Sequence, residues 1–470
     1  MNNKKVIKII GQIVEFLKLD KTKELYKIGI KSFTRDRKMG FEDIAVLSLR
    51  NSKKSLQINL NEFLKVFKEK EINYTKSSYT KARAKISPSL FIALNDELIE
   101  SYYEDKKSIE LYRGFRVFAI DGSTLQLPNV ESLSLKREGQ AQKMKQELRD
   151  IYGYNSNNVA DYETKARISI LEDVENKIVH QGILNSYFSS EKDMAFEHIE
   201  YLFKLKEKSS VSYNDLIIFD RGYPSYALML FLEKKGIDYL IRVSKSRFTE
   251  IEDFRRSKLQ DSIISIELTK TRLSDIKRKN NNPKIREVLK DKAVGDVINL
   301  RAIKVKLKSG EIEILITSLL DKKAYKTKIF KDFYFKRWSI EEEYKAIKSI
   351  LQVENFTGIT QIAINQDFFS ILFMLNMYNI MIQAVEEETI EEYNQKKKRK
   401  YKYKVNRNFA IGSIKDEFIY LLVTNGDIEA FYEKMLDTIS TNLTPNKPNR
   451  YFERNKKCRH KYPICQRSGA

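Results

Sequence analysis

The chain is poor in histidine and cysteine. Its 470 residues include three histidines and two cysteines. Three histidines spread over the whole chain exclude a metal centre built from several imidazole groups. Cys458, His460 and Cys465 lie near one another, but three ligands in an irregular spacing are too few for a structural zinc site. Two cysteines give no disulfide framework, so the composition favours a reducing compartment.

Two common phosphate-binding motifs are missing. Neither G-x-x-x-x-G-K-[ST] nor G-x-G-x-x-G occurs in the sequence. The glycines of these motifs let backbone N–H groups surround a nucleotide phosphate. We therefore expect neither a nucleotide-driven motor nor a dinucleotide-dependent enzyme.

Long apolar runs are also scarce. The stretch "FFSILFMLNMYNIMIQAV" at 368–385 is long enough to raise the question of a membrane span. Ser370, Asn376, Asn379 and Gln383 interrupt it, and the N-terminal segment lacks the apolar centre of a signal peptide. We therefore expect a helix buried in a large soluble core, a cytoplasmic location and no membrane partner.

Negative charge is in short supply relative to positive charge. The 64 Asp and Glu residues are outnumbered by 86 Lys and Arg residues, so the net charge is +22. Such a surplus creates a positive surface potential that favours a polyanion such as nucleic acid. The alternative is compositional, because chains encoded by AT-rich genomes are also rich in lysine, isoleucine and asparagine. The basic segment 74–91 is open to the same two interpretations, a helix that contacts DNA phosphates or a solvated face.

The periodicity of the apolar residues predicts three consecutive regions. Residues 1–105 have helical periodicity and form a probable DNA-binding region. Residues 106–385 alternate strands and helices, which predicts an α/β domain with a mixed sheet. Residues 386–470 are basic and mostly helical. Within the α/β domain we expect strands at 115–121, 166–185 (two strands), 215–220 and 238–244, with helices at 190–208 and 224–236.

A β-rich insertion is predicted at about 245–320. The segment 301–319 alternates apolar and charged residues on both sides of Ser309-Gly310, a pattern typical of a hairpin. Glu311 and Glu313 are placed to pair with lysines across this hairpin. A further strand is expected at 262–268.

Two acidic residues stand at the carboxyl ends of predicted strands. Asp121 stands in "AIDGS" and Asp220 in "IIFDRGY". An acid at the carboxyl end of a strand points into the crevice where open α/β sheets bind ligands. Each aspartate alone is also explained by its frequent use as a turn cap.

A third motif lies in "YFKRWSIEEEYKAIKS" at 334–349. Tyr334, Arg337, Glu341 and Lys348 stand at offsets of 0, 3, 7 and 14. At roughly 100° per residue, these four side chains share a stripe about 60° wide on one helix, whereas the adjacent glutamates 342 and 343 point toward solvent. The stripe combines a carboxylate with two cations and a phenol, which suits a metal ion beside phosphate groups. A surface helix stabilised by i,i+4 ion pairs is the alternative.

Together the three motifs resemble those of the DDE transposases of bacterial insertion sequences. The resemblance is to the branch with a Tyr-x2-Arg-x3-Glu-x6-Lys signature and a β-strand insertion before the last acid. The acids are separated by 99 and 121 residues, which suits that layout. The similarity covers residues 75–385, and the two ends of the chain show no specific match.

This resemblance implies a ribonuclease-H-like fold in which Asp121, Asp220 and Glu341 bind two divalent ions, Mg²⁺ or Mn²⁺. Oxygen ligands without histidine or cysteine fit these hard cations. In such enzymes, two ions activate the attacking oxygen and stabilise the leaving oxygen of an in-line displacement. Water first cuts the end of the element, and the freed 3′-hydroxyl then attacks target DNA.

The resemblance also implies which residues contact DNA. Tyr334, Arg337 and Lys348 would hold backbone phosphates, and Arg221 and Tyr223 are further candidates. Similar proteins act in bacteria as homodimers that bring two terminal inverted repeats of duplex DNA together. Two alternatives stay open: a metal-dependent nuclease on the same fold that does not join strands, and a non-catalytic DNA-binding protein derived from such an element.

Overall fold

The computed structural model describes residues 3–447 except 53, 69–72, 106–108, 129–146, 148, 154–163, 209–212, 245–247, 308–309 and 396–399. The chain forms two compact units. The sheet unit consists of Glu110–Thr124 and Arg167–Tyr344, and the helical unit consists of Met1–Ile109, Leu125–Ala166 and Lys345–Ala470. The Cys458–His460–Cys465 group considered above lies outside the described residues.

An eight-stranded mixed sheet forms the centre of the sheet unit, in the order β3-β2-β1-β4-β5-β8-β7-β6. β1 is parallel to β4 and β4 is parallel to β5, whereas β5, β8, β7 and β6 pair antiparallel in turn. This arrangement confirms the predicted mixed sheet. The strands are β1 (Phe115–Gln126), β2 (Lys165–Asp173), β3 (Ile178–Ser186), β4 (Asn214–Phe219), β5 (Asp238–Val243), β6 (Asp261–Glu267), β7 (Val297–Lys306) and β8 (Ile312–Thr317).

The strand β4 occupies a central place in the sheet because its residues are apolar on both faces. Leu216, Ile217, Ile218 and Phe219 are all fully buried. A short, continuous apolar run is typical of a strand that is covered on both sides. Asp220 directly follows the carboxyl end of this strand.

The strands of the predicted β-rich insertion belong to the main sheet. The hairpin β7–β8 is present, but β8 pairs with β5 from Leu240↔Thr317 to Val243↔Ile314, so the hairpin extends the main sheet. Pairing satisfies the backbone groups that β5 would otherwise expose at a sheet edge. Glu313 lies opposite Val305 and forms an ion pair with Arg242 of β5 at 2.6 Å, rather than with a lysine of the hairpin.

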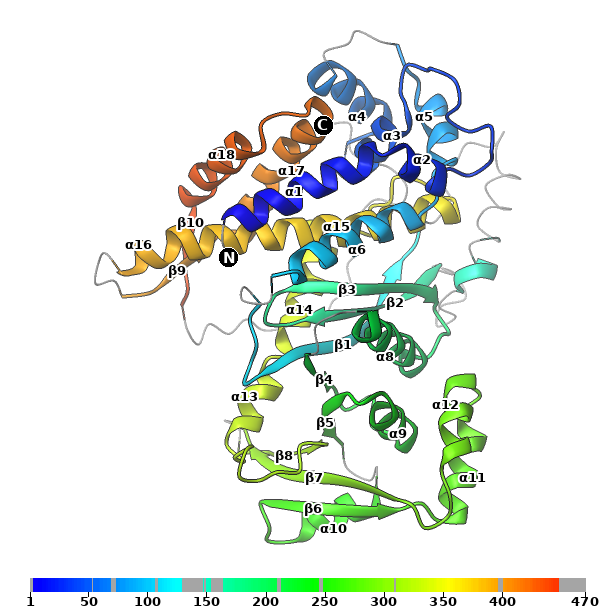
Figure 1. Cartoon of the computed structure of the whole chain (residues 1–470), viewed down its shortest axis with the longest axis vertical. Helices are drawn as coiled ribbons and strands as arrows, with labels where there is room; N and C mark the ends of the chain where they lie inside the picture. Colours follow the sequence, from blue (N-terminus) through cyan, green and yellow to red (C-terminus); the bar gives the residue numbers. More distant parts are fainter. Residues whose placement is uncertain are drawn as a thin grey trace, which may run out of the picture. The chain divides into compact units, whose positions relative to one another are not determined.

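Two helices cover one face of this sheet (Figure 1). α8 and α9 pack against each other, and Phe196 of α8 meets Phe231 of α9 in an edge-on ring contact. Their apolar side chains form one buried core with Phe118 and Ile120 of β1. The helices of the sheet unit are α8 (Glu191–Lys208), α9 (Tyr226–Lys235), α10 (Thr249–Arg256), α11 (Lys270–Lys279), α12 (Pro283–Val288), η4 (Leu289–Asp291), α13 (Ile329–Phe335) and α14 (Trp338–Lys345).

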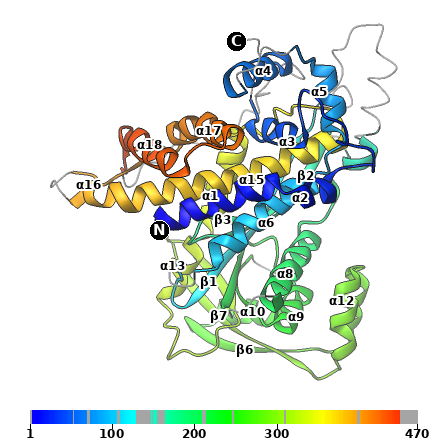
Figure 2. The ribbon, with the colours of Figure 1, turned by 45° about the horizontal axis from the view of Figure 1, so that its top comes forward.

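The helical unit is built around the long helix α15. Figure 2 shows α1, α6 and α15 running side by side, and α3 and α17 also pack against α15. The elements of this unit are α1 (Asn3–Lys18), α2 (Asp20–Tyr26), α3 (Phe41–Arg50), α4 (Leu56–Glu62), η1 (Phe63–Phe67), α5 (Lys76–Arg83), α6 (Ser89–Tyr103), η5 (Ala346–Ile350), α15 (Gln361–Val385), η6 (Glu386–Ile390), α16 (Glu391–Gln395), β9 (Tyr403–Val405), α17 (Arg407–Thr424), α18 (Ile428–Ser440) and β10 (Leu443–Pro445).

In the part of the chain that the structure describes, the helix starting at Gln361 is the one long and apolar enough to cross a membrane. Most of that stretch is buried by the rest of the chain. Its polar residues also have partners within the helical unit, since the Asn376 side chain donates to the Asn95 side chain at 2.7 Å. α15 therefore has the contacts of a core helix.

Arg83 is a structural residue of the helical unit. It belongs to the basic segment that we considered as a DNA contact, yet its side chain is buried and pairs with Asp367 at 2.8 Å. It also donates to Gln366 and Thr357. The neighbouring residues Lys76, Lys81 and Lys85 are exposed. These lysines therefore remain candidates for DNA contact.

The two units do not follow the three consecutive regions expected from the sequence, 1–105, 106–385 and 386–470. Residues from both ends of the chain join α15 in one helical unit. The physical reason is the burial of α15, which is apolar around most of its surface and therefore needs helices on several sides. Periodicity identifies such helices, but it does not indicate which of them pack together.

Candidate active site

The backbone of Asp121 is fixed from two sides. Asp121 lies in β1, and its carbonyl oxygen accepts hydrogen bonds from the Ser169 hydroxyl at 3.1 Å and the Tyr344 hydroxyl at 2.7 Å. The Asp121 carboxylate accepts from the N–H of Gly122 at 2.9 Å. β2 and α14 thus hold this part of β1 in place.

Asp220 follows β4 and begins the turn that leads to α9. Its Oδ1 accepts from the Tyr334 hydroxyl at 3.0 Å and forms an ion pair with Nε of Arg242 at 3.2 Å. Burial alone would raise the pKa of Asp220. The N–H of Arg221, the charges of Arg242 and Arg337, and the Tyr334 hydroxyl outweigh that effect and lower the pKa below its usual value. Asp220 is therefore a carboxylate at neutral pH.

The prediction that Tyr334, Arg337 and Glu341 lie on one regular helix is wrong. α13 ends at Phe335, and α14 begins at Trp338. Between them the N–H of Arg337 donates to the carbonyl of Tyr334 at 3.2 Å. Such a bond over three residues winds the chain more tightly than an α-helix does, so a uniform 100° per residue does not apply here.

Arg337 nevertheless pairs with Glu341, and its charge acts on the other two predicted acids. Its Nη2 donates to Oε1 of Glu341 at 2.8 Å, and the side chain is 7% exposed. Its charge opposes the effect of burial on the pKa of both Asp121 and Asp220. Its Nε–H is buried and has no hydrogen-bond partner among the described residues. One donor therefore remains for a group that enters the site.

The pKa of Asp121 is raised to about 6, chiefly by burial. The bond from Gly122 and the charge of Arg337 oppose this rise, and the charges of Glu191 and Asp220 add to it. The pKa of Asp121 and that of Asp220 are thus shifted in opposite directions, because Asp220 is in direct contact with the guanidinium of Arg242 whereas burial dominates at Asp121. A carboxylate that is poorly solvated in this way gains more from a nearby cation than an exposed one does.

Lys348 belongs to the helical unit, whereas the other three signature residues belong to the sheet unit. It lies in the π-helical turn η5, which directly follows α14, and it is half-buried. Glu342 is exposed as expected, but Glu343 is 1% exposed, which corrects the prediction that both point toward solvent. Glu343 shares the packed face of α14 with the buried residues Ile340 and Tyr344, so this face of the helix is not solvated.

The two weaker DNA-contact candidates differ in their surroundings. Arg221 is exposed in the turn after β4. The Tyr223 side chain is 2% exposed and packs against Phe219. A buried ring of this kind presents no surface to DNA, so we no longer consider Tyr223 as a contact, whereas Arg221 remains a candidate.

Two residues of the site were missed in the sequence. Arg242 interrupts the apolar strand β5 and pairs with Asp220 at 3.2 Å and with Glu313 at 2.6 Å. A charged residue within a buried strand was the available signal. Glu191 begins α8 and lies against Gly122, and no sequence motif distinguishes it from other glutamates at helix starts.

The chemistry of the site fits a hard divalent cation. The three predicted ligands are carboxylates, and such oxygens suit Mg²⁺ or Mn²⁺. Among the residues that the structure describes, no three carboxylate, imidazole or thiol side chains are grouped closely enough to hold one ion. Guanidinium groups occupy carboxylate oxygens instead, as in Arg337–Glu341 and Arg242–Asp220. A divalent cation and these arginines would compete for the same oxygens.

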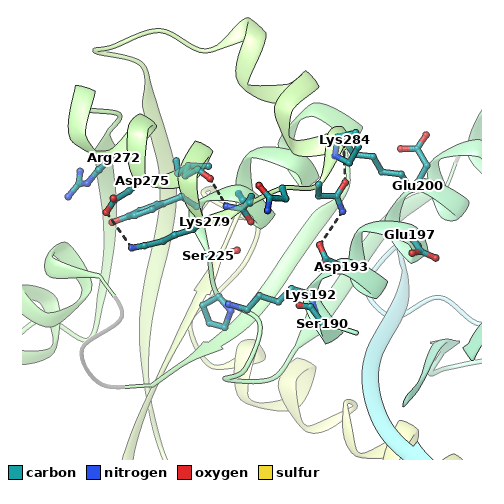
Figure 3. Close-up of a pocket in the computed structure, with 18 of the residues that line it drawn as sticks. Ser190, Lys192, Asp193, Glu197, Glu200, Ser225, Arg272, Asp275, Lys279 and Lys284 are labelled. Carbon is teal, nitrogen blue, oxygen red and sulfur yellow. Dashed lines mark hydrogen bonds and ion pairs between the residues drawn. The ribbon is translucent and has the colours of Figure 1, made fainter. Parts of the chain in front are cut away.

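A cavity of about 1020 Å³ lies elsewhere in the sheet unit, between the start of α8, the start of α9 and the pair α11–α12 (Figure 3). None of the three predicted acids lines it. Its lining mixes acidic and basic side chains, including Glu197, Lys204, Arg272 and Asp275. The cavity therefore does not include Asp121, Asp220 or Glu341.

Comparison with known proteins identifies the family of the chain. A family model described as "Transposase DDE domain" matches residues 112–377, which is more than half of the chain. The chain therefore belongs to this family, and the predicted relation to DDE transposases is confirmed. The narrower assignment to the insertion-sequence branch stays a prediction.

Two further comparisons add little. None of the curated proteins matches the sequence. Among solved structures, the chain is similar to one described as a cryo-EM structure of a piggyBac transposase synaptic complex with hairpin DNA, at 12% identity and a TM-score of 0.40, over 94% of this chain and 84% of that one. A likeness this distant carries no argument about function.

Proposed function

We propose that the protein is a DNA transposase that cleaves the ends of a bacterial insertion sequence and joins them to target DNA. The observation that carries the proposal is the buried Arg337, which pairs with Glu341 at 2.8 Å and whose charge acts on Asp121 and Asp220, in a chain of the transposase DDE domain family. The proposed fold of the sheet unit is ribonuclease-H-like. The net charge of +22 supports duplex DNA as the partner.

In this proposal Asp121, Asp220 and Glu341 hold two Mg²⁺ or Mn²⁺ ions. When bound, such ions activate the attacking oxygen and stabilise the leaving oxygen of an in-line displacement at phosphorus. In the first step, water attacks the phosphorus and the bond to the 3′ oxygen breaks. In the second step, the freed 3′-hydroxyl attacks a phosphorus of the target strand, and the bond from that phosphorus to its own 3′ oxygen breaks.

The chain's own cations position the DNA. The planar guanidinium of Arg337 can pair with a carboxylate or a phosphate through the same donors, so DNA entry moves it from Glu341 to the backbone. Tyr334 releases Asp220 in the same way and turns its hydroxyl to a phosphate. Lys348 and the exposed Arg221 contribute point charges to the backbone contact. The protein acts as a homodimer on two terminal inverted repeats in the bacterial cytoplasm.

One experiment tests the proposal against its alternatives. The protein is incubated with Mg²⁺ and DNA that carries the flanking inverted repeats, and the products are separated on a denaturing gel. Cleavage at the repeat ends followed by strand-transfer products is the expected result. Cleavage without joining would identify a nuclease, and binding without cleavage would identify a non-catalytic DNA-binding protein.

A further inference from the structure

The helix α5 of the helical unit carries a buried row and an exposed row of side chains. Tyr79 and Arg83 are 2% and 5% exposed, whereas Ser77 and Lys81 are exposed. At about 100° per residue, the two rows lie roughly opposite each other around the helix axis. α5 therefore turns a polar face away from the core of its unit.

The buried row fixes the orientation of α5. Nε of Arg83 donates to the Gln366 side chain at 2.7 Å, and the guanidinium group pairs with Asp367 at 2.8 Å. The Gln366 side chain donates back to the carbonyl of Arg83 at 3.0 Å. The hydroxyls of Tyr79 and Ser48 share a hydrogen bond of 3.0 Å. These bonds to α15 and α3 hold the helix firmly, and a surface on a rigid element keeps a precise geometry.

The exposed face of α5 is positively charged and has no acidic neighbours in the sequence. Residues 73–95 include no aspartate or glutamate. Among the residues that the structure describes, three exposed lysines have no ion-pair partner: Lys76, Lys81 and Lys85. Other lysines of the same unit are neutralised, since Lys68 pairs with Asp43 at 2.7 Å. Cations without a counter-charge favour a polyanionic partner.

One hydroxyl group on this face is also available to a partner. The Thr75 hydroxyl accepts the N–H of Ser78 at 3.2 Å and lies 3.1 Å from the Ser78 hydroxyl. The Thr80 hydroxyl donates to a backbone carbonyl of the preceding turn at 2.8 Å. Ser77, one turn before Lys81, has no hydrogen bond of its side chain within the described parts of the chain. Its small side chain also lets a partner approach the helix closely.

We infer that α5 recognises the sequence of duplex DNA at the ends of the insertion sequence. Its exposed row enters the major groove, where Ser77 and Lys81 contact base edges while Lys76 and Lys85 contact backbone phosphates. An α-helix is about 10–12 Å across and the major groove about 12 Å wide, and lysine suits the O6 and N7 acceptors of guanine. The inference rests on the proposed function, because it assigns recognition of the terminal repeats to one helix.

The test is binding of the full-length protein to two fluorescent duplexes, one with the terminal inverted repeat and one with the same bases scrambled. Anisotropy is measured at several salt concentrations without divalent cations, so DNA cleavage plays no part in the result. The variants are S77A, K81A, K76A and K85A. Because alanine favours helix formation, α5 should be preserved, and thermal melting verifies that each variant is folded.

K434A is the matched control for these variants. Lys434 is an exposed lysine of the same unit, but it lies on α18 and pairs with Glu417 at 2.8 Å. We expect K434A to bind both duplexes like the wild type. A general effect of removing one surface charge would appear in this variant as well.

We expect K81A to reduce the preference for the repeat about tenfold, and S77A to reduce it by a smaller factor. K76A and K85A should weaken binding to both duplexes alike, and each should flatten the slope of log K against log salt by about 0.9. Dimethyl sulfate footprinting should show guanine N7 atoms of the repeat protected by the wild type and exposed again in K81A.

Two results would overturn the inference. If K81A and S77A weaken binding to both duplexes equally, α5 contacts only the DNA backbone, and if they bind like the wild type, α5 does not contact DNA. A wild-type protein without preference for the repeat would also exclude sequence recognition by α5. The proposed chemistry is decided separately, by cleavage of the repeat DNA with Mg²⁺.

Discussion

Arg337 and Glu341 form an ion pair one helical turn apart, with Nη2 of the arginine 2.8 Å from Oε1 of the glutamate. The arginine is 7% exposed and the glutamate 24%. The pair links the residue proposed to hold phosphate with a residue proposed to hold metal. Substitutions of the two residues can therefore be distinguished by measuring DNA cleavage, DNA binding and Mn²⁺ binding separately.

Replacing Glu341 with glutamine should abolish cleavage and leave DNA binding largely intact. Glutamine removes the charge of a proposed metal ligand without removing a phosphate contact, and we expect at least a 100-fold loss of cleavage. E342Q is the control, because Glu342 is the exposed neighbour on the same helix. Gel cleavage assays and fluorescence anisotropy measure the two properties. Near-normal cleavage by E341Q would remove Glu341 from the site.

Replacing Arg337 with methionine should strengthen Mn²⁺ binding in the absence of DNA. The guanidinium group pairs with Glu341, and its charge also acts on Asp121 and Asp220. Removing a competing cation should raise the affinity about tenfold, equivalent to about 1.4 kcal/mol. R337K, which retains the charge, should change it less. Equal or weaker Mn²⁺ binding by R337M would show that the arginine does not compete with metal.

Replacing Lys348 with alanine should weaken DNA binding and reduce its salt dependence. Loss of one phosphate contact is expected to flatten the slope of log K against log salt by about 0.9. Anisotropy titrations between low and moderate salt measure this slope. K345A is the comparison, because Lys345 is exposed on the preceding helix and is not a signature residue. An unchanged slope in K348A would count against a phosphate contact.

Replacing Tyr223 with phenylalanine should stabilise the protein. The substitution removes a buried hydroxyl that has no partner in the described structure, which should raise the free energy of unfolding by about 1 kcal/mol. Thermal melting and urea unfolding measure this gain. A destabilised Y223F would mean that the hydroxyl has a partner in solution.

Replacing Asp261 with asparagine should destabilise the sheet unit in a pH-dependent manner. Burial would raise the pKa of Asp261, but hydrogen bonds from Arg301 and Thr327 and the charges of Arg301 and Lys322 lower it to about 2. A pKa lowered on folding contributes stability above the unfolded pKa, near 4, and that stability is lost as the pH falls toward 2.

The expected cost of D261N is about 2 kcal/mol at pH 7, because the 1% exposed Arg301 loses its partner. Roughly half of this difference in the free energy of unfolding between D261N and the wild type should remain at pH 3. The chain has a single tryptophan, Trp338, which lies in the sheet unit. Its fluorescence during urea unfolding reports on that unit. A difference independent of pH would show that the charge of Asp261 is not the cause.

The sequence predicts the sheet well because its strands carry strong local signals. β4 is a continuous apolar run, and α9 is bounded by Ser225 as the N-cap and Gly236 in the left-handed conformation. Asp220 directly follows β4 as expected, whereas Asp121 lies within β1, which continues past the predicted end to Gln126. Local patterns of this kind depend on few neighbours, so they survive in the folded chain.

The remaining features depend on contacts between distant residues. Arg242 joins Asp220 to Glu313, and Glu191 reaches Gly122 only because α8 packs against β1. The tight turn before α14 likewise could not be predicted by assuming a uniform 100° per residue. Arg83 has the composition of a surface cation, and its burial becomes evident only when Asp367 is placed beside it.

The assembly of the helical unit from separated segments has a consequence for biosynthesis. The apolar flank of α6, which ends at Tyr103, packs on α15, which begins at Gln361, about 250 residues later. The first helices therefore leave the ribosome long before the partner that shields them from water exists. Until that partner emerges, the nascent chain carries exposed aliphatic surface, and holdase chaperones are the natural protection during this interval.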